Sequence, residues 1–288
     1  MQIDFALILS AGLGTRMGEI GKKIPKVLWP IYFKKMLELQ IRYCEDLNIK
    51  NIYINTHFLH DEIIHFLSEA KLSDRVTVLH EDPLLDSGGA IHNVASRPEI
   101  NYNGNLLLVN GDQFLFFNNK YWDEAKARIA SSRAVLFGIK VDKQATYNET
   151  VVEKNQLVEI KKNIDKKNEY VTYSGLGLLN LSGLKPVAGI SQFFETVANY
   201  KKERVDLITP DVFEYWDFGT AEIYTKNVFK LKLPQAKESL MDLFLKKHSA
   251  YIGRKELFID TKKNSLDLEC LGQFATDSIH ADGIFQKI

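Results

Sequence analysis

Two aspartates and two cations, far apart in the chain, are of the types that phosphate chemistry needs. Asp112 ends the segment V-N-G-D, and Asp217 lies in the segment W-D-F-G-T. Arg16 and Lys26 follow a glycine-containing turn near the N-terminus. Mg²⁺ prefers one or two carboxylates together with phosphate oxygens, and arginine and lysine bind phosphate by charge-assisted hydrogen bonds. The aspartates are therefore candidate Mg²⁺ ligands, and the cations are candidate phosphate-binding residues.

Each aspartate also has an ordinary structural interpretation. Asp217 can cap the helix that we expect to begin at Gly219. Asp112 can be a turn residue, because aspartate is common in turns. The cationic loop near the N-terminus favours the metal interpretation for both.

That loop belongs to a strand–turn–cation segment, residues 7–30. The apolar residues 5–9 predict a buried strand, and S-A-G-L-G-T-R-M follows it, with glycines that let backbone N–H groups approach a ligand. Backbone N–H donors next to positively charged side chains are typical of phosphate-binding loops. The common glycine motifs do not match, because Met17 replaces the third glycine of the dinucleotide fingerprint and no Ser or Thr follows Lys22 as a Walker A loop requires.

Strand-like and helix-like segments alternate from this segment onward. This alternation predicts right-handed crossovers and a mainly parallel sheet, with ligands beyond the carboxyl ends of the strands. Three strand ends carry small or polar residues, at 10–12, 80–82 and 110–112, and we expect them to converge. The expected strands are 5–9, 51–55, 76–79, 106–109 and 134–141, and the expected helices are 36–48, 59–70, 90–96 and 124–131.

The pattern changes after residue 141. Short strands are expected at 150–153, 157–161 and 170–181, forming an antiparallel wall over the sheet, and helices at 193–202, 219–232 and 237–248. Residues 249–288 are strand-like and poorly patterned. The stretch 271–276 has the form of one hexapeptide-repeat rung, and one rung is weak evidence for a solenoid. We expect one large domain at 1–233 and a C-terminal helix and strand-like appendage at 234–288.

Composition restricts the class of partner. The 288 residues suffice for one large α/β domain with an appendage. Lys plus Arg and Asp plus Glu both number 37, so the formal net charge is zero, which argues against nucleic-acid binding through overall charge. Cys44 and Cys270 form no CxxC pair, which favours a reducing compartment. No leader or membrane-length apolar run is recognisable, so we expect a cytoplasmic protein without a membrane partner.

Several motifs in order resemble those of the nucleotide-sugar pyrophosphorylases, the sugar-1-phosphate nucleotidyltransferases. They are G-x-G-T-R-M with a following P-K pair, V-N-G-D, W-D-F-G-T, L-D-S-G-G-A at 85–90 and Y-S-G-L at 173–176. The subgroups that the chain resembles most are N-acetylmuramate-1-phosphate uridylyltransferases and mannose-1-phosphate guanylyltransferases. The resemblance implies a Rossmann-like, mainly parallel sheet with helices on both faces, a small antiparallel sugar-binding wall and a C-terminal appendage.

The resemblance also implies a reaction. A sugar 1-phosphate attacks the α-phosphate of UTP or GTP, and the products are pyrophosphate and a UDP- or GDP-sugar for cell-envelope synthesis, with Mg²⁺ as the cofactor. The residues implied are Arg16, Lys26, Asp112 and Asp217 for catalysis, the two aspartates also as metal ligands; Ala11, Gly12, Gly14, Thr15, Glu81 and Gly88 for the nucleotide; and Asn110, Glu159, Ser174 and Gly175 for the sugar.

The chain departs from the family pattern in three places. Asp86 replaces the usual glycine of the base-binding loop, and Phe33 and Lys35 stand in place of the glycine and proline of a G-K-P segment. The sugar-phosphate segment at 159–162, E-I-K-K, is an approximate match. A carboxylate at Glu81 suits guanine, whereas the uridylyltransferase subgroup suggests uracil, so both bases stay open.

Two other functions compete with this interpretation. A cytidylyltransferase that acts on an alcohol phosphate such as phosphocholine shares the G-x-G-T-R loop. A non-catalytic nucleotide-sugar sensor could use the same fold. The C-terminal segment is in addition a candidate contact for a homodimer.

Overall fold

The computed structural model describes residues 2–142, 145–162, 169–232 and 238–250, and beyond them only four strands of two residues. These strands are β14 (Ile259–Asp260), β15 (Ser265–Leu266), β16 (Ile279–His280) and β17 (Ile284–Phe285). The hexapeptide-like stretch 271–276 and most of the expected appendage lie outside the described residues. The expected domain boundary at residue 233 lies outside the described residues and stays a prediction.

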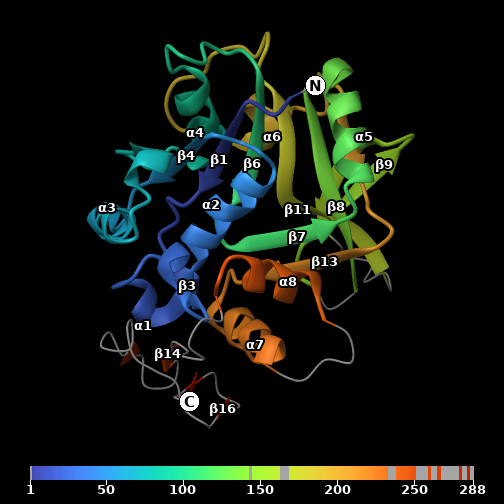
Figure 1. The fold of residues 1–288 in the computed structure, drawn as a ribbon. Coiled ribbons are helices and arrows are strands. Elements are labelled where there is room, and N and C mark those ends of the chain that lie inside the picture. The colour runs from blue at the N-terminus through green and yellow to red at the C-terminus, as the bar shows by residue number, and fades with distance from the viewer. Residues whose placement is uncertain are drawn as a thin grey trace.

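A nine-stranded mixed sheet forms the centre of the molecule (Figure 1). Its strands are β1 (Phe5–Leu9), β4 (Asn51–Thr56), β5 (Val76–His80), β6 (Asn105–Asn110), β8 (Ala134–Asp142), β9 (Asn148–Glu153), β10 (Gln156–Lys162), β11 (Glu169–Asn180) and β12 (Val205–Ile208). They lie in the order β5-β4-β1-β6-β11-β8-β12-β10-β9. The first four are mutually parallel, β12 is parallel to β8, and β11 and β10 are antiparallel to their neighbours. The strands expected as an antiparallel wall thus extend the main sheet.

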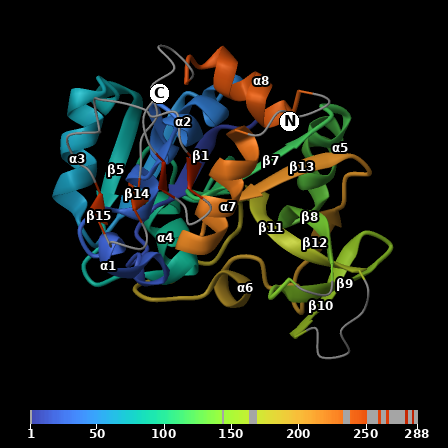
Figure 2. The same ribbon diagram turned by 90° about the horizontal axis from the view of Figure 1, so that it is seen from below.

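Helices cover both faces of this sheet (Figures 1 and 2). One apolar cluster packs α2 (Met36–Asp46), α3 (His60–Glu69), α5 (Lys120–Arg128), α7 (Ala221–Lys232) and α8 (Leu240–Lys247) against the sheet. A second cluster packs α4 (Asp86–Ala95) and α6 (Phe193–Thr196). Along β1, Ala6 and Ile8 belong to the first cluster and Leu7 to the second, as the two-residue period of a strand requires. The predicted two-faced α/β architecture is confirmed.

Short elements complete the described fold. They are α1 (Gly18–Gly21), the 3-10 turns η1 (Thr15–Met17), η2 (Lys26–Leu28), η3 (Ser73–Arg75) and η4 (Ile129–Ser131), and the hairpin of β2 (Pro30–Ile31) and β3 (Lys34–Lys35). No described helix is both long enough and apolar enough to cross a membrane.

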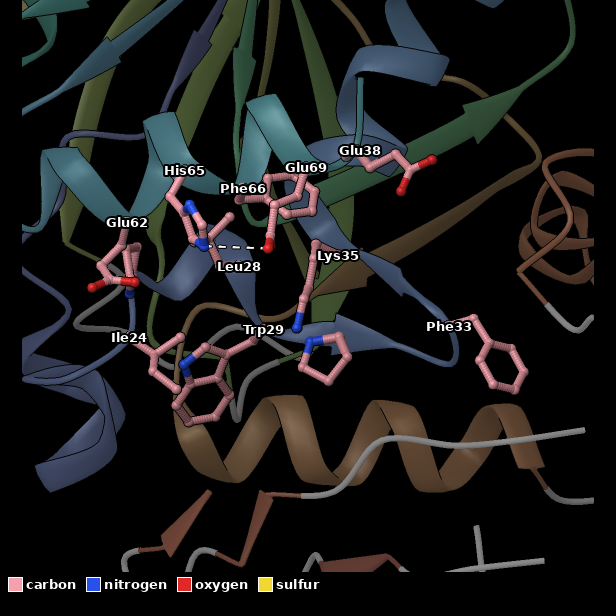
Figure 3. Close-up of a pocket in the computed structure, with 13 residues that line it drawn as sticks. Ile24, Leu28, Trp29, Phe33, Lys35, Glu38, Glu62, His65, Phe66 and Glu69 are labelled. Atoms are coloured by element: carbon pink, nitrogen blue, oxygen red, sulfur yellow. Dashed lines mark ion pairs between the residues drawn. The ribbon is translucent and has the colours of Figure 1, made fainter. Parts of the chain in front are cut away.

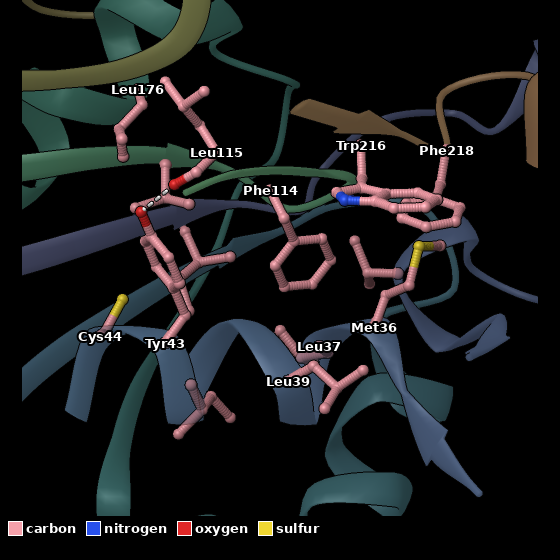
Figure 4. Packing of buried hydrophobic residues seen from close by; sticks show 14 of the residues in the cluster. Met36, Leu37, Leu39, Tyr43, Cys44, Phe114, Leu115, Leu176, Trp216 and Phe218 are labelled. Atoms are coloured by element: carbon pink, nitrogen blue, oxygen red, sulfur yellow. Dashed lines mark hydrogen bonds between the residues drawn. The ribbon is translucent and has the colours of Figure 1, made fainter. Parts of the chain in front are cut away.

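A separate two-stranded antiparallel sheet pairs β7 (Gln113–Phe117) with β13 (Phe213–Asp217). Phe114 of β7 and Trp216 of β13 are almost fully buried. In Figure 4 the Phe114 ring lies above Leu37 and Leu39 of α2, and the Trp216 ring lies above Met36. The Tyr43 hydroxyl of α2 donates a hydrogen bond of 2.7 Å to the backbone oxygen of Leu115. Burying these aromatic rings fixes the two strands against α2, and this ribbon positions the site described below.

Three expected helix boundaries were wrong. Helix α5 begins at Lys120 rather than at residue 124. Helix α4 begins at Asp86 rather than Ala90, so both glycines lie inside it. They serve close packing, because a Cβ on Gly88 would lie 2.6 Å from the backbone oxygen of Ser191. Helix α6 ends at Thr196, although helix was expected to residue 202. There the Asn199 side chain accepts from the N–H of Lys201 at 3.2 Å, a local bond that competes with the helical pattern.

Candidate functional site

The three polar strand ends meet at one edge of the sheet, as predicted. The Ser10 N–H donates to Oδ1 of Asn55 at 2.7 Å, and Nδ2 of Asn55 donates to Oε1 of Glu81 at 2.9 Å. On the other side of β1, the Gly111 N–H donates to the backbone oxygen of Leu9 at 3.0 Å. Asn55 therefore joins the ends of β1 and β5 by its side chain.

The ribbon of β7 and β13 places the two candidate metal ligands beside each other. Asp217 pairs with Gln113 in the strand register, and the Phe218 N–H donates to the backbone oxygen of Asp112 at 2.9 Å. An ideal Cβ on Gly219 would lie 2.9 Å from Oδ1 of Asp217 and 3.1 Å from Oδ2 of Asp112. Both carboxylates therefore lie beside Gly219, although the two aspartates are far apart in the sequence.

Lys26 joins this pair through an ion pair of its Nζ with Oδ2 of Asp112. The two side chains are mostly buried, with exposed fractions of 17% and 11%. Pro25 precedes the turn η2 that begins at Lys26, and Gly111 lets this turn approach β6 closely, since a Cβ there would lie 2.8 Å from Cγ1 of Val27. A cation that is fixed beside two carboxylates can contact anionic oxygens in the same place.

Helix α7 holds the lysine-bearing segment from the other side. The ring of Tyr224 packs edge-on against Trp29 with centroids 5.0 Å apart, and the Tyr224 hydroxyl donates to the backbone oxygen of Pro30. Because α7 follows Asp217 directly, one helix links the position of Lys26 to that of Asp217.

The predicted phosphate loop is open on one side and tightly folded on the other. Gly14 has φ +66°, and a Cβ on Gly21 would lie 2.4 Å from the Gly14 oxygen, so neither position has room for a side chain. A Cβ on Gly12 would meet no atom within 4 Å. Thr15 and Arg16 are exposed, whereas the side chain of Ala11 is buried. The loop thus presents to solvent its backbone, the Arg16 guanidinium and the side chains of Leu13 and Thr15.

The residues predicted to read the base are mainly engaged within the protein. Glu81 is 1% exposed, and its second carboxylate oxygen accepts from the Leu85 N–H at 3.0 Å. Asp86 has φ +61°, a left-handed conformation that explains why glycine is usual there, and its Oδ1 accepts from the Ser87 N–H at 2.6 Å. Base reading by Glu81 and Gly88 stays a prediction.

On the sugar side, the structure brings Asn110 and Gly175 together. Gly175 has φ +86°, and a Cβ there would lie 2.3 Å from both Nδ2 of Asn110 and Oε1 of Gln113. Ser174 is 2% exposed, and its hydroxyl donates to the Phe137 oxygen at 2.7 Å. Glu159 lies apart on β10, where its exposed carboxylate is 3.9 Å from Nζ of Lys161.

Three further residues at this site were missed from the sequence, and the first is Asn55, which joins the strand ends. Gln113 accepts from Nδ2 of Asn110 at 2.7 Å, and its place directly after Asp112 was an available signal. The Tyr147 hydroxyl donates to Oδ2 of Asp217. Tyr147 stands in a polar loop without a motif, so no sequence signal identified it.

The donor set fits Mg²⁺. Within the described part of the chain, no group of three or more His, Cys, Asp or Glu side chains gathers to hold a metal ion. A cation bound by Asp112 and Asp217 would have two carboxylate oxygens and would take its other ligands from water or substrate. Mg²⁺ commonly binds in this way.

A separate cavity of about 330 Å³ lies behind the turn that carries Lys26 (Figure 3). Leu28, Trp29 and Phe66 form part of its apolar wall, and His65 and Glu69 lie 3.3 Å apart on its α3 side. Lys35 projects into the cavity. Burial lowers the pKa of this lysine to about 8.

Comparison with known proteins agrees with this geometry. The family model described as "Nucleotidyl transferase" matches residues 5–166, more than half of the chain. The chain belongs to this family. It is 26% identical over 227 residues to the D-glycero-alpha-D-manno-heptose 1-phosphate guanylyltransferase of Campylobacter jejuni. The aligned stretch covers 76% of this chain and 96% of that protein.

Other proteins are similar to this chain over different lengths. A bifunctional sugar-1-phosphate nucleotidylyltransferase/acetyltransferase of Sulfurisphaera tokodaii is 30% identical over 156 residues, which are 54% of this chain and 35% of that protein. HddC from Yersinia pseudotuberculosis, solved in complex with GMP-PN, superposes with a TM-score of 0.65 at 22% identity, over 80% of this chain and all of that one. At this identity the superposition shows the fold.

Proposed function

We propose that this nucleotidyl transferase moves a nucleoside monophosphate from a nucleoside triphosphate to a sugar 1-phosphate, with Mg²⁺ at Asp112 and Asp217. The observation that supports this most is that the two carboxylates lie together beside Gly219 and that Lys26 forms an ion pair with Asp112. An N-cap or a turn role for either aspartate would not require the other to be near. The sugar-1-phosphate nucleotidyltransferases among the relatives support the class of acceptor.

The chemistry is a single displacement. An oxygen of the sugar phosphate forms a bond to the α-phosphorus, the bond between this phosphorus and the bridging α–β oxygen breaks, and pyrophosphate leaves with the electron pair. A phosphate monoester has its second pKa near about 6, so the nucleophile is already ionised at neutral pH and needs no general base. The remaining barrier is the approach of two anions, which positioning and fixed charge reduce.

The residues of this chain supply that positioning. Lys26, held beside Asp112, would neutralise the α-phosphate or the incoming phosphate, and Arg16 with the backbone amides of residues 12–15 would bind the β- and γ-phosphates. Mg²⁺, when bound, supplies positive charge that screens the phosphate oxygens. Asn110 and Gly175 would line the sugar.

We propose GTP as the preferred nucleotide substrate and UTP as the alternative. The Campylobacter relative is a guanylyltransferase. The carboxylate of Glu81 adds little to this choice, because both of its oxygens already accept protein hydrogen bonds.

A matrix of substrates tests the proposal. Purified protein with Mg²⁺ is given each of GTP, UTP, CTP, ATP and dTTP with a panel of hexose and heptose 1-phosphates, and pyrophosphate release is measured. We expect turnover that requires both a sugar 1-phosphate and Mg²⁺. Turnover only with phosphocholine and CTP would establish the alcohol-phosphate alternative, and nucleotide binding without pyrophosphate release in any well would establish a sensor.

A further inference from the structure

Tyr147 contacts the candidate metal site from a part of the chain that the family motifs do not include. It lies directly before β9, and its hydroxyl donates a hydrogen bond to Oδ2 of Asp217. The other carboxylate oxygen, Oδ1, accepts from the Gly219 N–H at 2.7 Å. Asp217 is therefore held at both oxygens, once by backbone and once by a side chain.

The direction of the Tyr147 hydrogen bond follows from the chemistry of the two groups. A tyrosine hydroxyl carries a proton at neutral pH, whereas an ionised carboxylate has none to donate, so the carboxylate can only accept. Each carboxylate oxygen has a second lone pair, so the contact leaves Asp217 able to bind a cation.

A second tyrosine fixes the loop that carries Tyr147. The hydroxyl of Tyr170, on β11, lies 2.8 Å from the backbone oxygen of Ala145 and 2.9 Å from that of Tyr147. Tyr170 is 4% exposed, so water competes little for these contacts. The chain Tyr170–Tyr147–Asp217 connects the central sheet to the candidate metal site.

We propose that Tyr147 is a positioning residue that sets the Asp217 carboxylate for a divalent cation, and that Tyr170 holds Tyr147 in place for this role. The inference rests on the proposed function, which assigns the cation to Asp217. A ligand that is oriented before the ion arrives loses less freedom on binding, and partners of metal ligands usually contribute strongly to metal affinity.

The test measures metal affinity without turnover. Mn²⁺ serves as the probe, and free Mn²⁺ is followed by electron paramagnetic resonance during titration of the full chain without nucleotide. Tyr147→Phe removes only the hydroxyl, and we expect the Mn²⁺ dissociation constant to rise about tenfold. Tyr170→Phe frees the loop but leaves the Tyr147 hydroxyl, so we expect a smaller rise in the same direction.

Tyr121→Phe is the matched control. The Tyr121 hydroxyl donates to Oδ2 of Asp211 at 2.8 Å, so the variant removes the same kind of contact away from the site. We expect its Mn²⁺ dissociation constant to equal that of the unaltered protein. Thermal unfolding of each variant shows whether it is folded, and if Tyr147→Phe does not fold, Tyr170→Phe decides the test.

The outcomes separate the two proposals. If the unaltered protein binds Mn²⁺ and Tyr147→Phe binds it equally or more tightly, Tyr147 has no positioning role and the proposed function is unaffected. If the unaltered protein binds no Mn²⁺ with or without GTP, the cation site itself is wrong and the inference falls with it. A rise of similar size in Tyr121→Phe would show a general loss of stability and would also overturn the inference.

Discussion

Two lysines at either end of one short segment have opposite electrostatic surroundings. Lys26 forms an ion pair with Asp112 on the side of the strand ends. Lys35 projects into the cavity behind the same segment, and among the described residues it has no carboxylate within 4.0 Å. Its neighbour Lys34, in contrast, donates to Glu38 at 2.8 Å.

The comparison shows that burial alone does not identify a functional cation. A buried charge that is paired keeps its ionised form, whereas a buried charge without a partner is destabilised and its pKa moves toward the neutral form. Lys26 has a carboxylate partner, Asp112, beside the candidate metal site. Lys35 is of the second kind, and we expect it to lower the stability of the fold at neutral pH.

The largest expected effect is on activity, from breaking the pair at Asp112. Asp112→Ala removes one cation ligand and leaves Lys26 without its carboxylate. We expect turnover to fall by about 10³-fold or more, since a metal ligand and the placement of a cation are lost together. Pyrophosphate release measures the rate, and far-ultraviolet circular dichroism should show an intact fold. A rate within tenfold of the unaltered protein would remove Asp112 from the site.

Lys26→Ala leaves both carboxylates and removes the cation. We expect turnover to fall by about 10²-fold, as for the loss of one charge-stabilising contact. Lys34→Ala is the control in the same segment, because Lys34 pairs with Glu38 on α2 rather than with Asp112. We expect its rate to stay close to normal. Equal losses in the two variants would mean that the segment needs positive charge in general rather than at Lys26.

The smallest expected effect is on stability, from Lys35→Met. The pKa of Lys35 is about 8 in the folded protein and 10.5 in an exposed lysine, so the unfolded chain binds the proton more tightly. The resulting destabilisation is complete below pH 8, shrinks as pH rises toward 10.5 and is absent above it. Methionine has no charge to bury, so the substitution removes this destabilisation. We expect the free energy of unfolding to rise by about 1–3 kcal/mol at pH 7.

Urea unfolding of Lys35→Met at pH 7 and at pH 10 checks this expectation. The gain should be clearly smaller at pH 10, and turnover at pH 7 should be unchanged. A gain that is independent of pH would come from apolar packing alone. A loss of stability at pH 7 would show that the ammonium group of Lys35 has a favourable partner in the protein.

Much of the fold was predictable because its strands are apolar runs. Strands β1, β4, β5, β6 and β8 were expected within one or two residues of where they lie, since each is bounded by turn residues and alternates with a helix. The boundaries of α4 and α6 were not predictable. They depend on the close contact of Gly88 with Ser191 and on the side chain of Asn199, which involve local or tertiary partners that no periodicity reveals.

The part of the candidate site that consists of charged residues was predictable from the sequence, because carboxylates and lysines are typical of metal and phosphate binding. Asp112, Asp217 and Lys26 were singled out by charge and by their place after strands or turns, and the structure brings them together. Asn55 and Tyr147 were not singled out, because an amide or a phenol is an ordinary residue until the register of the sheet places it beside a carboxylate.

The pairing of β7 with β13 has a consequence for how the protein is made. Asp112 lies in the region that the family model matches, whereas Asp217 and its strand are synthesised much later, beyond residue 166. A nascent chain that has just passed residue 166 holds the glycine loop and one aspartate, but β7 still lacks its partner. The two-aspartate centre can therefore form only after β13 has left the ribosome, and truncated translation products would lack it.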